Sequence, residues 1–170
     1  MSGFPRDTTG HDTAFRGNVR EQLSEIIANL LLITPRPMIV CPDELSPTSD
    51  ILIAYDGSFT ATRAVQLFAL FRIVLDRLIQ VVSIDSSMEL ASLRTARAAK
   101  YLRAHGYQVK EIPIASRVSS AEALRSEIVN RKIRTAVMGA YGHRGFRERL
   151  FGSTTSTLLE NPQCALFLYH

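Results

Sequence analysis

The sequence predicts an α/β fold: an open, five-stranded parallel sheet with helices on both faces, plus an additional helix and strand at the N-terminus. From residue 50 onward, short β-branched apolar runs alternate with longer stretches of helical periodicity. Capping signals stand where helices should begin, as with Ser119 followed three residues later by Glu122. Strands that alternate with helices at this spacing are typical of βαβ units, which build a parallel sheet.

The predicted strands cover residues 51–55, 79–84, 109–114, 135–138 and 164–169. The first strand is the compact run ILIAY, which ends at Asp56-Gly57 and has the character of a buried strand.

Helical patterns fill the spaces between these strands. After Ser58, apolar residues recur at three- and four-residue spacing as far as Leu78. The stretch 88–105 is rich in Ala, Leu and Arg, and Gly106 follows it where a left-handed cap would fall. The last helix is short and ends at Pro162.

The sequence divides into residues 1–49, an N-terminal helix–strand extension, and residues 50–170, the α/β domain. In the extension, Asn18 and Glu21 are suited to cap a helix that Pro35 and Pro37 end, and an apolar strand follows at 38–41. Gly17 stands directly before this helix. The end of the chain repeats the order of glycine, helix, proline and apolar strand, starting at Gly152. We therefore interpret residues 17–42 as the remnant of a preceding repeat; the alternative is an unrelated helix and strand.

Composition excludes several classes of protein. Apolar residues make up 46% of the chain, which is enough for a globular core. The net charge of +4 comes from scattered Lys and Arg, so nucleic-acid binding is not expected. No apolar run is long enough to span a membrane, and the first residues lack the apolar core of a signal peptide, which favours a cytoplasmic protein. Cys41 and Cys164 lie in apolar runs without metal-ligand spacing, so both are expected to be buried free thiols.

The strongest candidate for a binding site is the glycine-rich segment 139–154, which follows a predicted strand and leads into a helix. Gly139 and Gly142 lack a Cβ, so their backbone N–H groups can approach phosphate oxygens closely. Gly152, Ser153 and Thr154 stand at a helix start, where free N–H groups and hydroxyls favour an anion. The spacing G-x2-G-x9-G-S-T is neither a P-loop nor the dinucleotide motif GxGxxG. The alternative is that these glycines serve only tight turns and a helix cap.

The ends of three predicted strands should contribute to the same site. In open parallel sheets, ligands bind at the carboxyl ends of strands, where the strand order reverses. The residues that follow 55, 84 and 138 are therefore where we expect the ligand.

The run ILIAYDGS at 51–58, the residues VMG at 137–139 and the motif G-x2-G-x9-G-S-T together resemble the universal stress protein family. The resemblance covers roughly residues 50–170 and is strongest to the members that keep the glycine motif and bind ATP. It implies a Rossmann-like, adenine nucleotide alpha hydrolase-like fold. The N-terminal extension is similar to the last helix and strand of a first domain in tandem members.

The resemblance also implies roles for single residues. Asp56 would face the nucleotide, near the ribose or a phosphate-bound Mg²⁺ ion; the alternative is that Asp56 only makes an Asx turn with Gly57. Ser83 and Ile84 resemble the backbone edge that reads adenine. The residues implied to hold ATP are Ala54, Tyr55, Asp56, Ser83, Ile84, Met138, Gly139, Gly142, Gly152, Ser153 and Thr154.

We therefore expect a nucleotide-binding regulatory protein whose association changes with ATP occupancy. Two alternatives stay open: a slow ATPase or nucleotidyl-transfer enzyme, and a dimerisation module that binds no nucleotide. The sequence offers no HxGH signature, P-loop lysine or SGGxDS loop, so no catalytic residue is assigned. The resemblance implies a homodimer joined through the C-terminal strand 164–169, which should lie at a sheet edge. The strand 38–41 would cover that edge, either within the chain or across a dimer.

Overall fold

The computed structural model describes residues 22–23, 25–27, 29–31, 33–72, 75–140 and 153–170, and in these residues six strands form a single sheet. In chain order, the elements are β1 (Met38–Val40), β2 (Ile51–Ala54), α2 (Phe59–Phe71), β3 (Leu78–Asp85), α3 (Met88–Ala104), β4 (Gln108–Ala115), α4 (Ser120–Asn130), β5 (Thr135–Gly139), α5 (Ser153–Glu160) and β6 (Ala165–Tyr169). Helical residues between 22 and 33 precede β1, and we call them the N-terminal helix.

The strand order in the sheet is β1-β6-β5-β2-β3-β4. From β2 the chain moves outward through β3 to β4, and it then crosses back to β5 and β6 on the other side of β2. The five strands β2 to β6 are all parallel, as predicted, and β1 runs antiparallel to β6. The strand order therefore reverses between β2 and β5, in the middle of the sheet.

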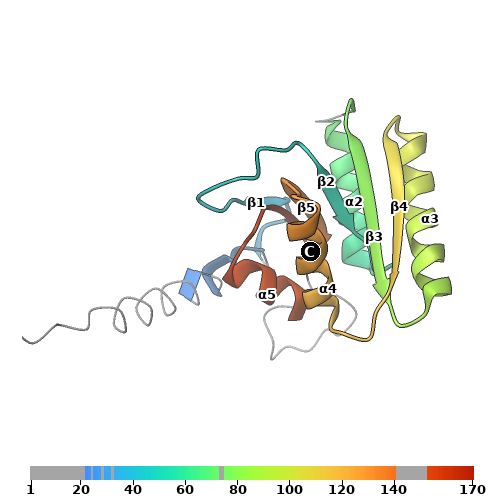
Figure 1. The fold of residues 1–170 in the computed structure, drawn as a ribbon. Helices are drawn as coiled ribbons and strands as arrows, with labels where there is room; N and C mark the ends of the chain where they lie inside the picture. Colours follow the sequence, from blue (N-terminus) through green and yellow to red (C-terminus); the bar gives the residue numbers. More distant parts are fainter. Residues whose placement is uncertain (1–21, 24, 28, 32, 73–74, 141–152) are drawn as a thin grey trace, which may run out of the picture.

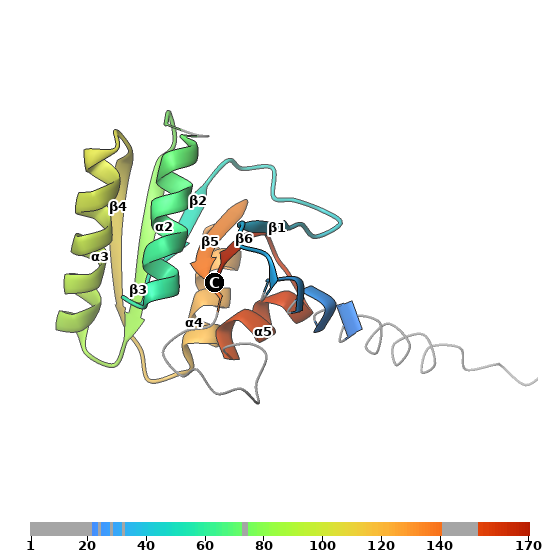
Figure 2. The same cartoon turned by 180° about the vertical axis from the view of Figure 1, so that it is seen from behind.

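Helices cover both faces of the sheet (Figures 1 and 2). Because right-handed crossovers in opposite directions place their helices on opposite faces, α2 and α3 share one face while α4 and α5 share the other. The side chains of α2 and α3 pack with Ile53, Val81 and Val137 in one core cluster. Those of α4, α5 and the N-terminal helix pack with Leu52, Met138 and other strand residues in a second cluster.

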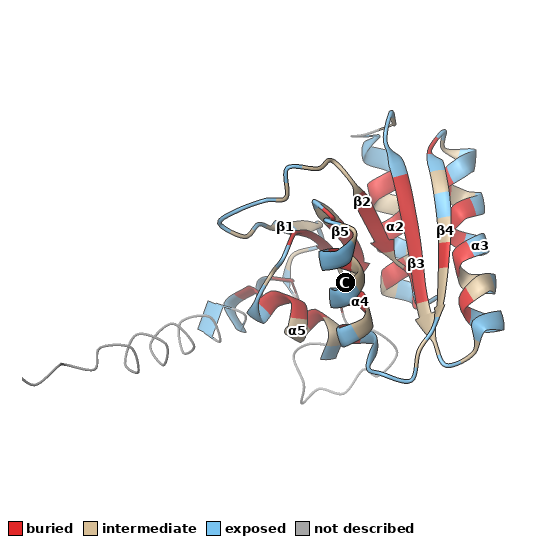
Figure 3. Cartoon of the chain, in the orientation of Figure 1, coloured by how far each residue is buried: buried red, intermediate tan, exposed pale blue. Residues whose placement is uncertain are grey.

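Burial follows this layering (Figure 3). The central strands β2 and β5 are buried at three consecutive positions each, since helices cover both of their faces. The edge strand β4 alternates between exposed and partly buried residues over much of its length.

Serine side chains begin three of the helices. Ser58, Ser87 and Ser119 each accept a hydrogen bond at Oγ from the backbone N–H three residues later. Ser119 is the N-cap of α4, as the sequence pattern predicts, and its Oγ also donates to the Glu122 carboxylate at 3.0 Å. Gly106 has a φ of +89° after α3, which confirms the predicted left-handed cap.

Two expectations about the elements were wrong. The apolar rhythm after Ser58 was expected to continue to Leu78, but α2 ends at Phe71 and Leu78 begins β3. Arg72 ends the helix in the left-handed region with a φ of +50°, without a glycine or proline to signal it. Cys41 is exposed rather than buried, because it follows β1 at the edge of the sheet. Cys164 is buried, and desolvation raises the pKa of its thiol to about 11.

The strand 38–41 covers the C-terminal strand, as predicted, and the pairing lies within the chain. β6 is not an edge strand, because β5 lies on one side of it and β1 on the other. Ile39 pairs with Phe167 in an antiparallel register, so the N-terminal strand covers this edge within the chain. A dimer joined through β6 would first require β1 to leave. No helix among the described residues is long and apolar enough to cross a membrane.

Candidate functional site

The carboxyl ends of β2, β3 and β5 meet at the point where the strand order reverses. β2 lies between β3 and β5, and Ile53 is in register with Val81 on one side and with Val137 on the other. Because the three strands are parallel, the segments that follow them leave from the same edge of the sheet. The structure thus brings together the predicted residues Ala54, Tyr55, Asp56, Ser83, Ile84, Met138 and Gly139 at one end of the sheet.

The turn after β2 is held by Asp56. Its Oδ1 accepts a hydrogen bond of 2.9 Å from the backbone N–H of Ser58, and Gly57 between them has a φ of +81°. Ser58 is buried and caps α2 through the N–H of Ala61 at 3.1 Å. This is the Asx turn that the sequence left open for Asp56. The Asp56 side chain is exposed at the rim of the site.

The turn after β3 is built from the same parts. Asp85 Oδ1 accepts from the backbone N–H of Ser87 at 2.9 Å, and Ser87 Oγ caps α3 at the N–H of Leu90. The other carboxylate oxygen of Asp85 pairs with Arg94 of α3 at 2.6 Å. The Ser87 N–H and then the Arg94 guanidinium lower the pKa of Asp85 below its usual value of 3.8.

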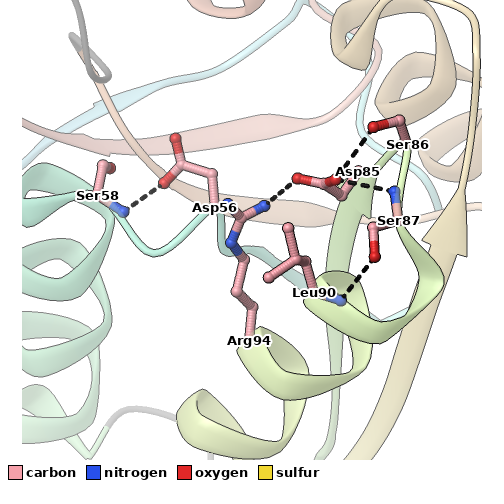
Figure 4. A network of polar contacts seen from close by, with 7 residues as sticks. All are labelled: Asp56, Ser58, Asp85, Ser86, Ser87, Leu90 and Arg94. Carbon is pink, nitrogen blue, oxygen red and sulfur yellow. Dashed lines mark hydrogen bonds and ion pairs between the residues drawn. The ribbon is translucent and has the colours of Figure 1, made fainter.

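Arg94 links the two turns. Figure 4 shows its guanidinium between the carboxyl groups of Asp56 and Asp85. A Cβ added at Gly57 would lie 3.5 Å from Arg94 Nε, so the arginine also lies against the first turn. Sequence reasoning did not select Asp85 or Arg94. The signal that could have found Asp85 is the repeated pattern Asp-x-Ser after two successive strands.

Ile84 presents backbone groups beyond the end of β2. The pairing of β2 with β3 ends at Ala54 and Val82, and the N–H of Tyr55 donates to the Val82 carbonyl at 2.9 Å. Alternate residues of a strand direct their N–H and C=O toward the same neighbour. The N–H and C=O of Ile84 therefore point toward the space past β2, where that strand has already turned away.

Ser83 and Tyr55 carry hydroxyl groups at the same strand ends. Ser83 is 1% exposed, and its Oγ has no hydrogen-bond partner among the described residues. Tyr55 is buried, and its hydroxyl pairs with Thr62 Oγ1 of α2 at 3.2 Å. An unsatisfied buried hydroxyl is uncommon in folded proteins.

Gly139 has a packing reason to be glycine. A Cβ at this position would lie 2.3 Å from the backbone nitrogen of Ala61 and 2.6 Å from the carbonyl carbon of Thr60. The end of β5 therefore touches the first turn of α2 directly, which only a residue without a side chain permits. The next residue, Ala140, donates its N–H to the carbonyl of Tyr169 at 2.7 Å.

Ser153 and Thr154 lie in the first turn of α5, where Ser153 is exposed and Thr154 is partly buried. Gly142 and Gly152, the other predicted residues of the glycine motif, lie outside the described residues. Within the described part of the chain, no group of three or more His, Cys, Asp or Glu side chains is arranged to hold a metal ion.

Taken together, the described residues offer backbone groups, hydroxyls and one exposed carboxylate at the carboxyl ends of β2, β3 and β5. Such an arrangement is suited to binding a polar molecule.

Known proteins resemble this chain in both sequence and fold. The chain is 26% identical to the universal stress protein Slr1230 of a Synechocystis species over 158 residues, which is 91% of this chain and 52% of the relative. The chain thus spans about half the length of that curated relative.

Solved structures share the fold. A universal stress protein from Archaeoglobus fulgidus DSM 4304 superposes with a TM-score of 0.66 at 16% identity, covering 87% of this chain and 56% of the other. A universal stress protein solved in complex with cAMP superposes with a TM-score of 0.57 at 15% identity, covering 72% of this chain and 97% of the other. These likenesses agree with the predicted α/β fold.

The model of the universal stress protein family matches residues 47–170, which include all the parallel strands and the candidate site. This chain belongs to the universal stress protein family.

Proposed function

We propose that the chain binds an adenine nucleotide, ATP with Mg²⁺, where β2, β3 and β5 end, and that it acts as a nucleotide-dependent regulatory protein. The observation that carries this proposal is the reversal of strand order between β2 and β5, which gathers the ends of three parallel strands. The related structure solved with cAMP supports an adenine nucleotide as the class of ligand.

The backbone of Ile84 fits the edge of adenine. The base offers an acceptor at N1 and a donor at its 6-amino group, which complement one N–H and one C=O of the same residue. Ile84 directs both groups past the end of β2, and a strand backbone can do this whatever its side chain is. We therefore propose that Ile84 carries most of the adenine-reading role that the resemblance implies for Ser83 and Ile84, since the Ser83 side chain is buried.

Asp56, Ser153 and Thr154 are suited to the polar end of the nucleotide. The hydroxyls of Ser153 and Thr154 stand in the first turn of α5, where helix N–H groups favour phosphate. Asp56 keeps one carboxylate oxygen outside its Asx turn and can accept from a ribose hydroxyl or hold a metal ion. Mg²⁺ would neutralise charge between this carboxylate and the phosphates.

Thermal unfolding in the presence of nucleotides tests this function. A ligand that binds only the folded state raises the melting temperature, and the stabilisation grows with the logarithm of the ligand concentration once that exceeds the dissociation constant. We expect ATP to raise the melting temperature and GTP at the same concentration to leave it unchanged. Guanine carries a donor at N1 and an acceptor at O6, so it opposes the donor–acceptor order of Ile84. No shift with ATP across millimolar concentrations would contradict the proposal.

A second candidate is a module that binds no nucleotide. Two observations favour it: the close packing of Gly139 against Thr60 and Ala61 explains that glycine, and the Asx turn accounts for Asp56. This candidate predicts that neither ATP nor GTP changes the melting temperature. The same titration therefore decides between the two functions, and a single-turnover assay of hydrolysis separates binding from a slow ATPase.

A further inference from the structure

Arg94 of α3 stands beside two carboxylates but forms an ion pair with only one of them. Its guanidinium lies between Asp56 and Asp85, which are found at the carboxyl ends of the neighbouring strands β2 and β3 (Figure 4). Asp85 pairs with Arg94 at 2.6 Å, whereas Asp56 forms no ion pair with any described residue. The arginine therefore neutralises the carboxylate that lies outside the proposed ligand contacts.

Asp56 is nevertheless within reach of Arg94. The stem of the arginine lies against the first turn, because a Cβ added at Gly57 would be 3.5 Å from Arg94 Nε and 3.7 Å from its Cγ and Cδ. A guanidinium carries five N–H donors in a planar fork, and Nη1 donates to Asp85. Because the fork lies between the two carboxyl groups, a rotation of the side chain is enough to move it from Asp85 to Asp56.

The surroundings of Asp85 favour its pairing with Arg94. The backbone N–H of Ser87 holds Asp85 Oδ1 at 2.9 Å, and this leaves Oδ2 for the arginine. The side chains of Arg94 and Asp85 are exposed by only 28% and 20%, so water and salt screen this pair less than a pair at the surface. Asp56 is exposed, and it competes less well for the same guanidinium.

A pairing of Arg94 with Asp56 would remove this carboxylate from the site. One oxygen of Asp56 accepts the N–H of Ser58, which leaves the other for a ribose hydroxyl or Mg²⁺. A guanidinium on that second oxygen would occupy its lone pairs and would repel a metal ion. The use of Asp56 by a ligand therefore requires that Arg94 be held elsewhere.

We propose that Asp85 is a positioning residue for the nucleotide site: by holding Arg94, it keeps the carboxylate of Asp56 free for the ribose or for Mg²⁺. Asp85 does not touch the ligand in this arrangement and acts only through Arg94. This role rests on the proposed nucleotide binding and adds to it a residue that controls the state of the site.

Calorimetric titration of the full chain with ATP and Mg²⁺ tests this role. Asp85→Asn keeps an oxygen for the N–H of Ser87, so it preserves the turn and removes only the charge that holds Arg94. We expect the affinity for ATP to fall about tenfold, which corresponds to one hydrogen bond to a charged group. Electrostatics through space predicts the opposite sign, because the substitution makes the site more positive and ATP is an anion.

A second substitution should reverse the loss. In the Asp85→Asn chain, Arg94→Met removes the competing guanidinium and keeps an unbranched side chain against Gly57, so the affinity for ATP should return to near the wild-type value. A structural defect caused by Asp85→Asn would not be repaired in this way.

The matched control is Glu111→Gln, which breaks another pair between an arginine and a carboxylate on the same helix. Glu111 of β4 pairs with Arg103 at 2.7 Å in the last turn of α3, at the opposite end of the helix from Ser87. This substitution should leave the affinity for ATP unchanged.

NMR of the nucleotide-free protein tests the arrangement separately. The Nε–Hε signal of Arg94 is identified by its loss in Arg94→Met. In the Asp85→Asn chain, Asp56→Asn should shift this signal strongly, because Arg94 then pairs with Asp56. With Asp85 in place, the same substitution should shift it far less. Equal shifts in the two backgrounds would overturn the proposal.

The titrations separate this role from the proposed function. If the wild type binds ATP and Asp85→Asn binds it as tightly or more tightly, nucleotide binding stands and the positioning role of Asp85 is overturned. A loss of affinity that Arg94→Met does not reverse would also overturn it. If the wild type binds no ATP, the proposed function fails, and the NMR comparison decides whether Asp85 keeps Arg94 away from Asp56.

Discussion

The turns that follow β2 and β3 have the same construction but different electrostatics. In each, an aspartate accepts the N–H of the serine two residues later at 2.9 Å, and that serine caps the next helix. Asp85 in the second turn is neutralised by Arg94, whereas Asp56 in the first turn is exposed at the rim of the candidate site. The same Asp-x-Ser turn therefore occurs in two settings. The second turn is fastened to its own helix by the pairing of Asp85 with Arg94, and the first leaves the carboxylate of Asp56 exposed, which we propose faces the ligand.

The largest effect on stability is expected at Gly139, where the end of β5 packs against the first turn of α2. Gly139→Ala would place a Cβ 2.3 Å from the Ala61 nitrogen, so β5 or α2 must move. We expect a loss of about 3 kcal/mol in the free energy of unfolding, at the upper end for overpacking. Gly106→Ala is the control, since a Cβ there meets nothing within 4 Å and only the positive φ is strained. Urea unfolding measures both, and equal losses would contradict the close contact.

The next largest effect on stability is expected from removing the caps of α2 and α3, Ser58 and Ser87, and the two losses should differ. Ser58 is 4% exposed, whereas Ser87 is only partly buried. Removing a cap costs about 0.5–2 kcal/mol, and the loss is larger where the freed N–H is shielded from water. We expect Ser58→Ala to lie near the top of that range and Ser87→Ala near the bottom, measured by urea unfolding. The reverse order would show that the two turns are not distinguished by burial.

Low pH should destabilise the second turn through Asp85. Folding lowers the pKa of Asp85 below 3.8, so its contribution to stability is complete above the unfolded pKa and disappears as the pH falls through the folded pKa. We expect Asp85→Asn to lower stability at neutral pH and to reduce the loss of stability below pH 3.8. Unfolding by urea at a series of pH values measures this. An unchanged acid dependence would mean that the Ser87 N–H and Arg94 do not stabilise the Asp85 carboxylate in the folded protein.

The smallest effect on stability is expected at Asp56. Asn keeps an oxygen that can accept from the Ser58 N–H, so Asp56→Asn should preserve the Asx turn and change the free energy of unfolding by less than about 0.5 kcal/mol. On our proposal ATP binding should nevertheless weaken, because the substitution removes the charge that we propose to face ribose or Mg²⁺. Calorimetric titration with ATP checks this. Unaltered affinity would limit Asp56 to its role in the turn.

Much of the fold could be predicted from the sequence, because burial of both faces leaves a clear pattern in a parallel sheet. The runs beginning at Ile51 and Thr135 are apolar at every buried position, and the capping box at Ser119 marks the start of α4 correctly. The end of α2 at Phe71 could not be predicted, since Arg72 adopts a left-handed conformation that the sequence does not signal. The sequence left open whether residues 38–41 cover the C-terminal strand within the chain or across a dimer, because strand pairing over a long separation leaves no local pattern.

The candidate site could be predicted in position but not in detail. Strand ends and glycines are visible in sequence, and Asp56 stands directly after a strand. Arg94 could not be found in this way, since it reaches Asp85 from nine residues farther along the chain through the packing of α3. The packing of Gly139 against Ala61 likewise depends on a contact between distant segments.

The short length of β1 has a consequence for solubility. Pro37 precedes the strand and Pro42 follows Cys41, and proline has no N–H to offer a neighbouring strand. A foreign chain can therefore extend the sheet only over about four residues at this end, which is too few to seed the stacked ladders of amyloid. Replacing these prolines would lengthen the edge and should make the protein prone to form fibres.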